Sequence, residues 1–179
     1  SIVITVFAVL LGFLFGIILA TVRCSYDKNE ESLKLRKGFG YHMLRFANGL
    51  CKLYITVVRG VPVVVQLMIW YFVILVTQNN STIVAVVAFG CNSAAYVAEI
   101  FRGGIMSIDA GQFEAGRSLG FNYVQTMFHI IIPQAIKTVL PTLLNEIIAL
   151  LKETSVAGYV GITDLTKAGD LIRGRTFEA

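Results

Sequence analysis

The chain has 179 residues, of which 56% are apolar and only 15% are charged, and its mean hydropathy is +0.73. Soluble domains average roughly 45–50% apolar and about 25% charged residues, so this composition excludes an ordinary soluble domain and favours a membrane protein. The net charge is +4. No basic patch with interleaved aromatic residues accompanies that charge, so the sequence predicts no nucleic-acid partner.

Residues 2–22 form the first apolar run, which contains no charged residue and is long enough to cross a bilayer. It lacks the basic leading region and the small-residue cleavage site of a signal peptide, so we expect the chain to begin inside a longer protein. Within this run, Gly12-x-x-x-Gly16 either permits close approach of a second helix or reflects the general frequency of glycine in membrane helices.

The charges are distributed unevenly along the first half of the chain. Residues 23–59 carry eight Lys/Arg against three acids, whereas the short polar loop at 78–81 carries no charge. Because cytoplasmic loops of membrane proteins are enriched in Lys and Arg, the pattern predicts that 23–59 is cytoplasmic and that 78–81 lies outside. Within that stretch, residues 46–60 have apolar positions at helical spacing, which predicts an amphipathic interfacial helix that leads into the membrane.

Three further apolar runs, at 61–77, 82–101 and 133–151, complete a set of four expected membrane spans. The tail 152–179 is too charged to form another. The sequence therefore predicts the all-α fold class: a polytopic membrane helix bundle in which residues 1–179 make a single transmembrane domain.

A polar insert of about residues 105–132, in a cytoplasmic segment expected to run over 102–132, separates the third and fourth spans. Its pattern predicts two short helices joined at an elbow. The signals are a capping-box spacing at Asp109 and Gln112, a terminating Gly120, a second capping-box spacing at Asn122 and Gln125, and Pro133, expected to limit the second helix. From capping alone, the insert is either a connector to a partner or a loop lying on the membrane surface.

The insert resembles the EAA coupling loop of ABC importer permeases, whose pattern is E-A-A-x-x-x-G-x(9)-I-x-L-P. The residues expected to form the ATPase-coupling loop are Glu114, Ala115, Gly116, Arg117, Gly120, Ile130 and Pro133. Gly116 replaces the second alanine of the pattern, and we expect this change to add flexibility.

Other blocks resemble permeases for polar amino acids, of the histidine, glutamine and arginine type. They are residues 54–66, residues 94–105 and the Lys-Glu-Thr-Ser sequence at 152–155, so the resemblance covers most of residues 2–170. The family usually has a fifth membrane helix, which is expected to follow Ala179. The connection 23–45 is longer than the resemblance leads us to expect.

The resemblance implies a multi-pass protein of the bacterial cell membrane that transports by alternating access. Its implied partners are ABC ATPase subunits, a second permease copy in a homodimer or heterodimer, an extracellular or periplasmic solute-binding protein, and membrane lipid. The chain contains no G-x-x-x-x-G-K-[ST] sequence, so ATP and Mg²⁺ are expected in the ATPase partner, with no cofactor and no enzymatic activity in this chain.

Charged residues inside membrane spans are costly and are usually paired or functional. Glu99 and Arg102, three residues apart, are expected to form a structural ion pair. The candidate substrate path comprises Asn145, Glu146, Glu153, Thr154 and Ser155. Their polar groups suit an ammonium and a carboxylate, although solvation of a helix end explains them equally well.

Two other functions remain open from the residues alone. An ion-driven transporter or channel subunit would need no partner at Glu114, and a membrane scaffold or sensor would show no transport. The insert favours the importer over both, but the sequence identifies neither the transported amino acid nor the type of dimer.

Overall fold

The computed structural model describes residues 2–35 and 39–176 of the chain. The described part is built of helices and contains no strand, which confirms the predicted all-α fold class. The α-helices are α1 (Ile2–Leu35), α2 (Phe39–Gly60), α3 (Val63–Ile69), α4 (Ser81–Met106), α5 (Gly111–Ser118), α6 (Tyr123–Thr126), α7 (Ile132–Glu153) and α8 (Leu165–Thr176). Two π-helical turns, η1 (Trp70–Ile74) and η2 (Met127–Ile131), and a 3₁₀ helix, η3 (Thr154–Val160), join them.

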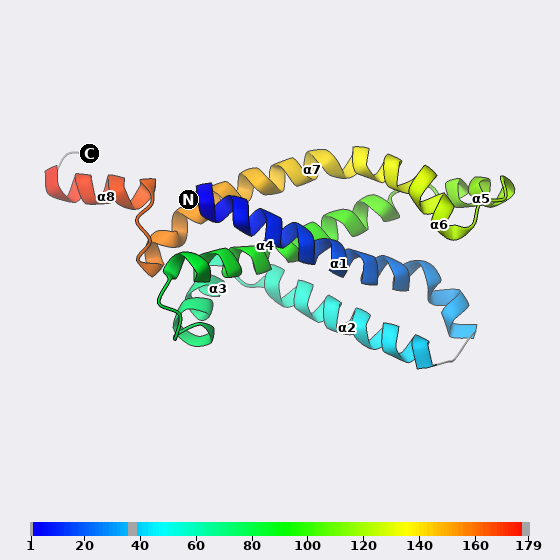
Figure 1. The fold of residues 1–179 in the computed structure, drawn as a ribbon, viewed down its shortest axis with the longest axis horizontal. Coiled ribbons are helices and arrows are strands. Elements are labelled where there is room, and N and C mark those ends of the chain that lie inside the picture. Colours follow the sequence, from blue (N-terminus) through cyan, green and yellow to red (C-terminus); the bar gives the residue numbers. More distant parts are fainter. Residues whose placement is uncertain (1, 36–38, 177–179) are drawn as a thin grey trace.

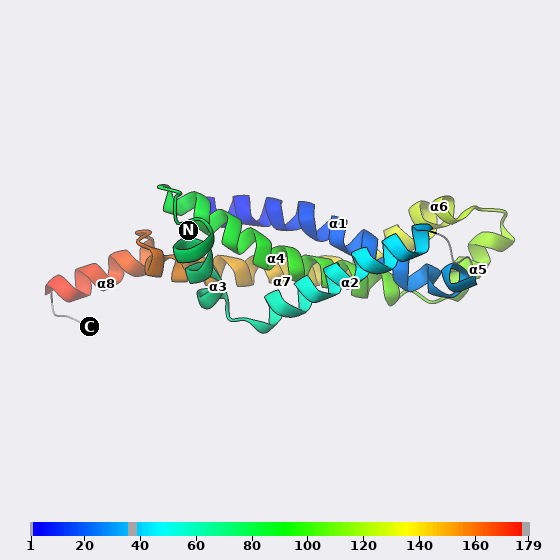
Figure 2. The ribbon, with the colours of Figure 1, turned by 90° about the horizontal axis from the view of Figure 1, so that it is seen from below.

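The four long helices α1, α2, α4 and α7 run lengthwise in an elongated bundle (Figure 1). The short helices α5 and α6 project from one end, which also holds the last turns of α1 and the first turns of α2 (Figures 1 and 2). The start of α1, together with α3 and α8, lies toward the opposite end. The polar insert, the end of α1 and the start of α2 therefore lie toward the same end of the molecule, as expected of segments that are all cytoplasmic.

Small residues hold α1 against α4. A Cβ added to Gly12 would lie 2.8 Å from the Ser93 Cβ, and one added to Gly16 would lie 2.6 Å from the Val97 Cγ1. Contacts this short leave no room for a side chain, so both glycines are required for the close approach of the helix backbones. The structure therefore supports the explanation that the Gly12-x-x-x-Gly16 spacing permits close approach of a second helix.

Three helices are long and apolar enough to cross a membrane: residues 2–27, 81–106 and 123–160. A fourth candidate is the pair 40–60 and 63–74, which is bent by 110° at its break. The span expected over 61–77 corresponds to the second half of this bent pair. Pro62, which cannot donate a backbone hydrogen bond, stands at the break, and the segment after it is a short helix followed by a π-helical turn.

The position of α2 fits the expected amphipathic helix that leads into the membrane. This helix packs along the bundle: Ile55 is buried against Ala95 and Ala98, and the Tyr54 hydroxyl donates to the Cys91 carbonyl. Cys91 lies in the middle of α4, so the end of α2 reaches well into the bundle.

Gln66 closes the break between α2 and α3. Its side chain is buried, and its Nε2 donates to the carbonyl oxygens of Val58 and Val61, each at 2.7 Å. A helix end leaves its last carbonyl groups without partners, and burial makes such groups costly. One side-chain amide therefore stabilises the sharp bend that turns α3 away from α2.

Candidate coupling loop and polar groove

The first arm of the insert is α5, and it ends in a Schellman motif. Gly120 adopts a φ of +79°, and the amide of Phe121 donates to the Gly116 carbonyl while that of Gly120 donates to Arg117. Glycine takes this left-handed conformation without steric cost, so the terminating role predicted for Gly120 is confirmed.

The second arm begins with a complete capping box. The Asn122 Oδ1 accepts from the Gln125 amide, and the Gln125 Oε1 accepts from the Asn122 amide, both at 2.9 Å. The corresponding prediction for Asp109 and Gln112 is wrong. Helix α5 begins one residue later than that spacing requires, and Asp109 instead accepts from the amide of Gly111, two residues on.

Gly116 locks the two arms together. It is buried, and a Cβ at this position would lie 2.7 Å from both Oγ1 and Cγ2 of Thr126, itself buried in the second arm. The expectation that Gly116 adds flexibility is therefore corrected, because its missing side chain is what allows α5 and α6 to touch. A stacked pair of rings, Phe113 and Tyr123, bridges the same two arms with centroids 6.5 Å apart.

The outer surface of the elbow is open. Glu114, Ala115 and Arg117 are exposed on α5, and Gly120 is exposed at the turn. Two large apolar side chains accompany them, Leu119 at 71% exposure and Val124 at 59%. Exposed apolar side chains among charged ones, on a rigid turn, are typical of a protein-binding surface.

The second arm continues directly into the fourth span. Pro133 lies in the first turn of α7, and the preceding turn η2 is π-helical, with the Ile132 amide donating to the Met127 carbonyl. Proline has no N–H to donate to the carbonyl four residues before it, so it cannot make the usual α-helical hydrogen bond. The wider π turn before Pro133 lets the helix continue without that bond. The expected break at Pro133 is therefore absent, and residues 123–160 run as one helical element, with Ile130 half-buried and Pro133 exposed on it.

A charge network ties α4 to α1 near the end that carries the loop. The Arg102 guanidinium donates to both carboxylate oxygens of Glu99, and its Nη1 donates to the Asp27 Oδ2 at 3.2 Å. The predicted ion pair between Glu99 and Arg102 is present. Sequence spacing could not show Asp27 as the third member, because it is 75 residues away along the chain.

The structure separates the five candidate path residues. Asn145 is exposed on α7, whereas the neighbouring Glu146 turns toward α4 and accepts from the Ser93 hydroxyl at 3.3 Å. Thr154 is fully buried and lies 3.3 Å from the Thr5 hydroxyl, which gives it a packing role rather than a place on an open path. Glu153 and Ser155 are partly exposed on either side of it.

Helix α7 has three faces, which the helical period separates. The face formed by Ala135, Val139, Leu143 and Leu150 is buried against the bundle. A second face exposes large apolar side chains at Ile136, Leu140, Leu144, Ile148 and Leu151. The third face exposes polar residues and a proline in the middle of the span: Thr138, Pro141, Thr142 and Asn145.

A polar face also runs along α2, where Arg45, Lys52, Thr56 and Arg59 follow one another at helical spacing and are exposed. Both helices pack on α1 through their other faces. Phe13 of α1 packs against a cluster that contains Val139 and Leu143 of α7, and Leu19 of α1 packs against a cluster that contains Ile55 of α2. Both helices also contact α4, so we take their exposed polar faces together with α4 as one candidate surface. We call this surface the α2–α4–α7 groove.

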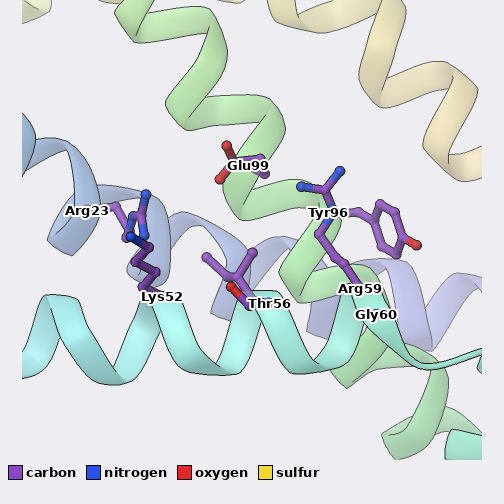
Figure 3. A pocket seen from close by; sticks show the side chains of 8 residues that line it. Arg23, Lys52, Thr56, Arg59, Gly60, Tyr96 and Glu99 are labelled. Carbon is purple, nitrogen blue, oxygen red and sulfur yellow. The ribbon is translucent and has the colours of Figure 1, made fainter.

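A cavity of about 490 Å³ lies between α1, α2 and α4. Figure 3 shows Arg23, Lys52 and Arg59 arranged around it, with Glu99 and Tyr96 on α4. The Arg59 guanidinium lies over the Tyr96 ring, 5.1 Å from its centroid. Sequence reasoning treated these cations only as a topology signal, because nothing in the order of residues shows that three helices bring them together.

A rigid two-armed loop fused to a membrane span, beside a polar groove in a helix bundle, defines a membrane transport subunit. The chain belongs to the family described as binding-protein-dependent transport system inner membrane component, whose model matches residues 38–177. It is accordingly a multi-pass inner-membrane protein, and the resemblance to amino-acid importer permeases drawn from the EAA pattern is confirmed.

Named relatives agree with this placement. The chain is 43% identical over 129 residues to the probable amino-acid ABC transporter permease YckA of Bacillus subtilis, covering 71% of this chain and 57% of YckA. It is 36% identical over 176 residues to the putative glutamine transport system permease GlnP of Rickettsia prowazekii, covering 97% and 73%. For GlnP of Escherichia coli K12 the identity is 39% over 137 residues, covering 74% and 63%.

A solved structure, titled as an amino acid ABC transporter with histidines, shares the fold with a TM-score of 0.80 and 36% identity. The match covers 98% of this chain and 75% of that one. The chain thus spans between about half and three quarters of the length of these relatives.

Proposed function

We propose that this chain is the permease subunit of an ATP-driven importer and moves a polar amino acid across the membrane by alternating access. The observation that carries the proposal is the rigid, exposed elbow of α5 and α6, built into the same helical element as the fourth span. The relatives named as amino-acid and glutamine permeases support the substrate class.

The elbow is the proposed contact of the ATPase subunits. A groove on an ATPase would hold the exposed side chains of Glu114, Arg117 and Leu119, while Gly116 and the Schellman turn keep the elbow rigid. Because α6 runs through η2 into α7 without a break, a rigid-body movement of the ATPase pair would tilt α7 directly. The ATP and Mg²⁺ would stay in those partner subunits.

The α2–α4–α7 groove is the proposed wall of the translocation path. Polar side chains in a membrane span avoid lipid and face a bundle interior or a water-filled cavity. Thr138, Thr142 and Asn145 are exposed in the described part of the chain, so a second permease copy would complete the enclosure. A solute-binding protein would deliver the amino acid at the opposite end from the elbow, and lipid would cover the apolar faces.

The test is co-purification of the full-length tagged protein from mild-detergent membranes, with mass spectrometry of its partners. We expect an ATPase with a P-loop to co-purify, and Glu114→Lys to reduce its recovery by about tenfold, because the charge is reversed at the centre of the contact. Asp170→Lys is the matched control, since it makes the same change on an exposed position of α8. An ATPase that stays bound to Glu114→Lys, with normal uptake, would contradict the coupling assignment; a pure homo-oligomer would contradict the importer.

A further inference from the structure

Helix α2 has an apolar face that the other described elements leave uncovered. The helix lies at an edge of the bundle (Figures 1 and 2). One of its sides packs on α1 and α4, whereas five large apolar side chains elsewhere on the helix are more than half exposed: Met43, Phe46, Leu50, Leu53 and Val57. An exposed apolar face of this size marks a contact with lipid or with a protein partner. The residues beside it decide between the two.

A shallow depression of about 490 Å³ lies on this face, toward the start of α2. A Cβ added to Gly49 would have no heavy atom within 4 Å, so the missing side chain leaves an open space there. The depression has polar side chains nearer the start of the helix and apolar ones further along it. Its lining residues are His42, Arg45, Phe46, Gly49, Leu50 and Leu53.

The depth of the depression in the membrane follows from its level relative to α1. Residues 2–22 contain no charge, so the hydrocarbon layer ends just after that run. Leu19 of α1 packs at the level of Ile55, and the two helices run in opposite directions (Figure 1), so the same boundary crosses α2 near residue 51. Arg45 then begins about 9 Å beyond the boundary, at the outer edge of the headgroup layer, and its long side chain can reach back to the phosphates.

The polar side chains of the depression are available to a ligand. Arg45 is exposed and makes no hydrogen bond or ion pair with the described residues. The His42 ring is held edge-on by Tyr41, with centroids 5.4 Å apart, and it stays exposed. A guanidinium offers paired N–H groups that match the oxygens of a phosphate, and an imidazole N–H can add a further hydrogen bond.

We propose that this depression binds an anionic phospholipid of the cytoplasmic leaflet, with the phosphate on Arg45 and His42 and an acyl chain over Gly49 toward Leu53. The order along α2 favours a lipid over a protein partner, because a cation at headgroup depth followed by apolar side chains at hydrocarbon depth repeats the order within a lipid molecule. A zwitterionic headgroup carries a positive charge beside its phosphate and is attracted less. The site is separate from the elbow and from the α2–α4–α7 groove, and it goes beyond the proposed function.

The test uses the full-length protein, with any subunits that co-purify, in nanodiscs of equal parts phosphatidylglycerol and phosphatidylcholine. One lipid at a time carries a photoactivatable diazirine in its acyl chain, and mass spectrometry maps the adducts. Arg45→Gln removes the charge, Arg45→Lys keeps it, and Gly49→Leu fills the depression, where a side chain has room. Lys52→Gln is the matched control, because it removes an exposed cation from the same helix but lines the other cavity.

We expect the phosphatidylglycerol probe to label residues 46–53 about fivefold more than the phosphatidylcholine probe, which is the contribution of one cation near an anionic surface. Arg45→Gln should make the two yields equal, and Arg45→Lys should keep most of the preference. Lys52→Gln should leave the preference within about twofold of the wild type. Gly49→Leu should lower the yield from both probes.

Three results would overturn the proposal. One is equal labelling by the two probes in the wild type, and another is a preference that Arg45→Gln leaves unchanged or that Lys52→Gln abolishes as well. The third is labelling of the exposed apolar face of α1, at Leu10 and Leu14, without any adduct at 46–53, since protein would then cover α2. None of these measurements needs transport or ATP, so failure of the proposed importer would leave them unchanged.

Discussion

At the scale of single residues, the elbow of α5 and α6 depends on the absence of a side chain at Gly116. The EAA pattern has alanine at this position. From the sequence alone, glycine in its place indicates a lower helix propensity. In the structure the position is buried under Thr126, and the two arms touch because no Cβ separates them. A residue that weakens one helix in isolation thus stabilises the junction of two.

This contact gives the first residue-scale prediction. Gly116→Val should separate α5 from α6 and cost about 1–3 kcal/mol in the local stability of the loop, because extra methyl groups overpack a closed contact. Proteolysis of the loop in the purified protein, together with recovery of the ATPase, measures the effect. The control is Ala115→Val, which adds similar bulk to an exposed position on the same helix. Equal protection of the two variants would show that the arms do not need this contact.

At the scale of elements, the loop is defined by how its helices begin and end. Gly120 ends α5 in a left-handed conformation, and the reciprocal bonds of Asn122 and Gln125 begin α6 within two residues. Both signals are local, so the sequence was sufficient to predict them. The π turn before Pro133 was not predictable in this way, because a proline usually ends or kinks a helix and only the surrounding packing decides otherwise.

The capping box gives the prediction at this scale. Asn122→Ala removes the acceptor for the Gln125 amide and should cost about 1 kcal/mol, which frays α6 before it affects α7. Hydrogen exchange of the amides in residues 123–126 should accelerate by about fivefold, while exchange in the buried part of α7 stays unchanged. Asn122→Asp keeps an acceptor at the same position and should retain protection. Unchanged exchange in Asn122→Ala would show that tertiary contacts alone hold this turn.

At the scale of the whole molecule, α7 carries an exposed polar face, which we propose lines the path, and a separate exposed apolar face, which we propose meets lipid. The faces alternate around the helix, so Thr142 and Leu144 stand two residues apart on different sides of the same span. If the groove holds water, a cysteine at Thr142 should react with a membrane-impermeant thiol reagent in the assembled complex, and a cysteine at Leu144 should not. The background is a variant lacking Cys24, Cys51 and Cys91.

Labelling rates measured in sealed vesicles test this prediction, and we expect the Thr142→Cys rate to exceed the Leu144→Cys rate by about tenfold or more, since water and ionised thiol are scarce in lipid. Addition of the transported amino acid should slow labelling at Thr142. Equal rates at the two positions would show that the polar face of α7 does not line a water-filled path.

The sequence by itself determined the membrane class, the end of α5 at Gly120, the start of α6 after Asn122, and the ion pair of Glu99 with Arg102. Each of these rests on composition or on residues a few positions apart, where hydrophobic transfer, capping and helical spacing act locally. The lengths of the apolar stretches also predicted the membrane spans that α1, α4 and α7 contain.

Only the tertiary structure decided how α2 and α3 lie, which polar residues share the groove, and that Arg23, Lys52 and Arg59 surround one cavity. A run of basic residues satisfies the positive-inside rule wherever its helix packs, so charge counting could not distinguish a cytoplasmic α2 from one returning along the bundle. The direction of that helix depends on contacts between residues far apart in the chain, such as Ile55 with Ala95, and such contacts form only when the whole bundle assembles.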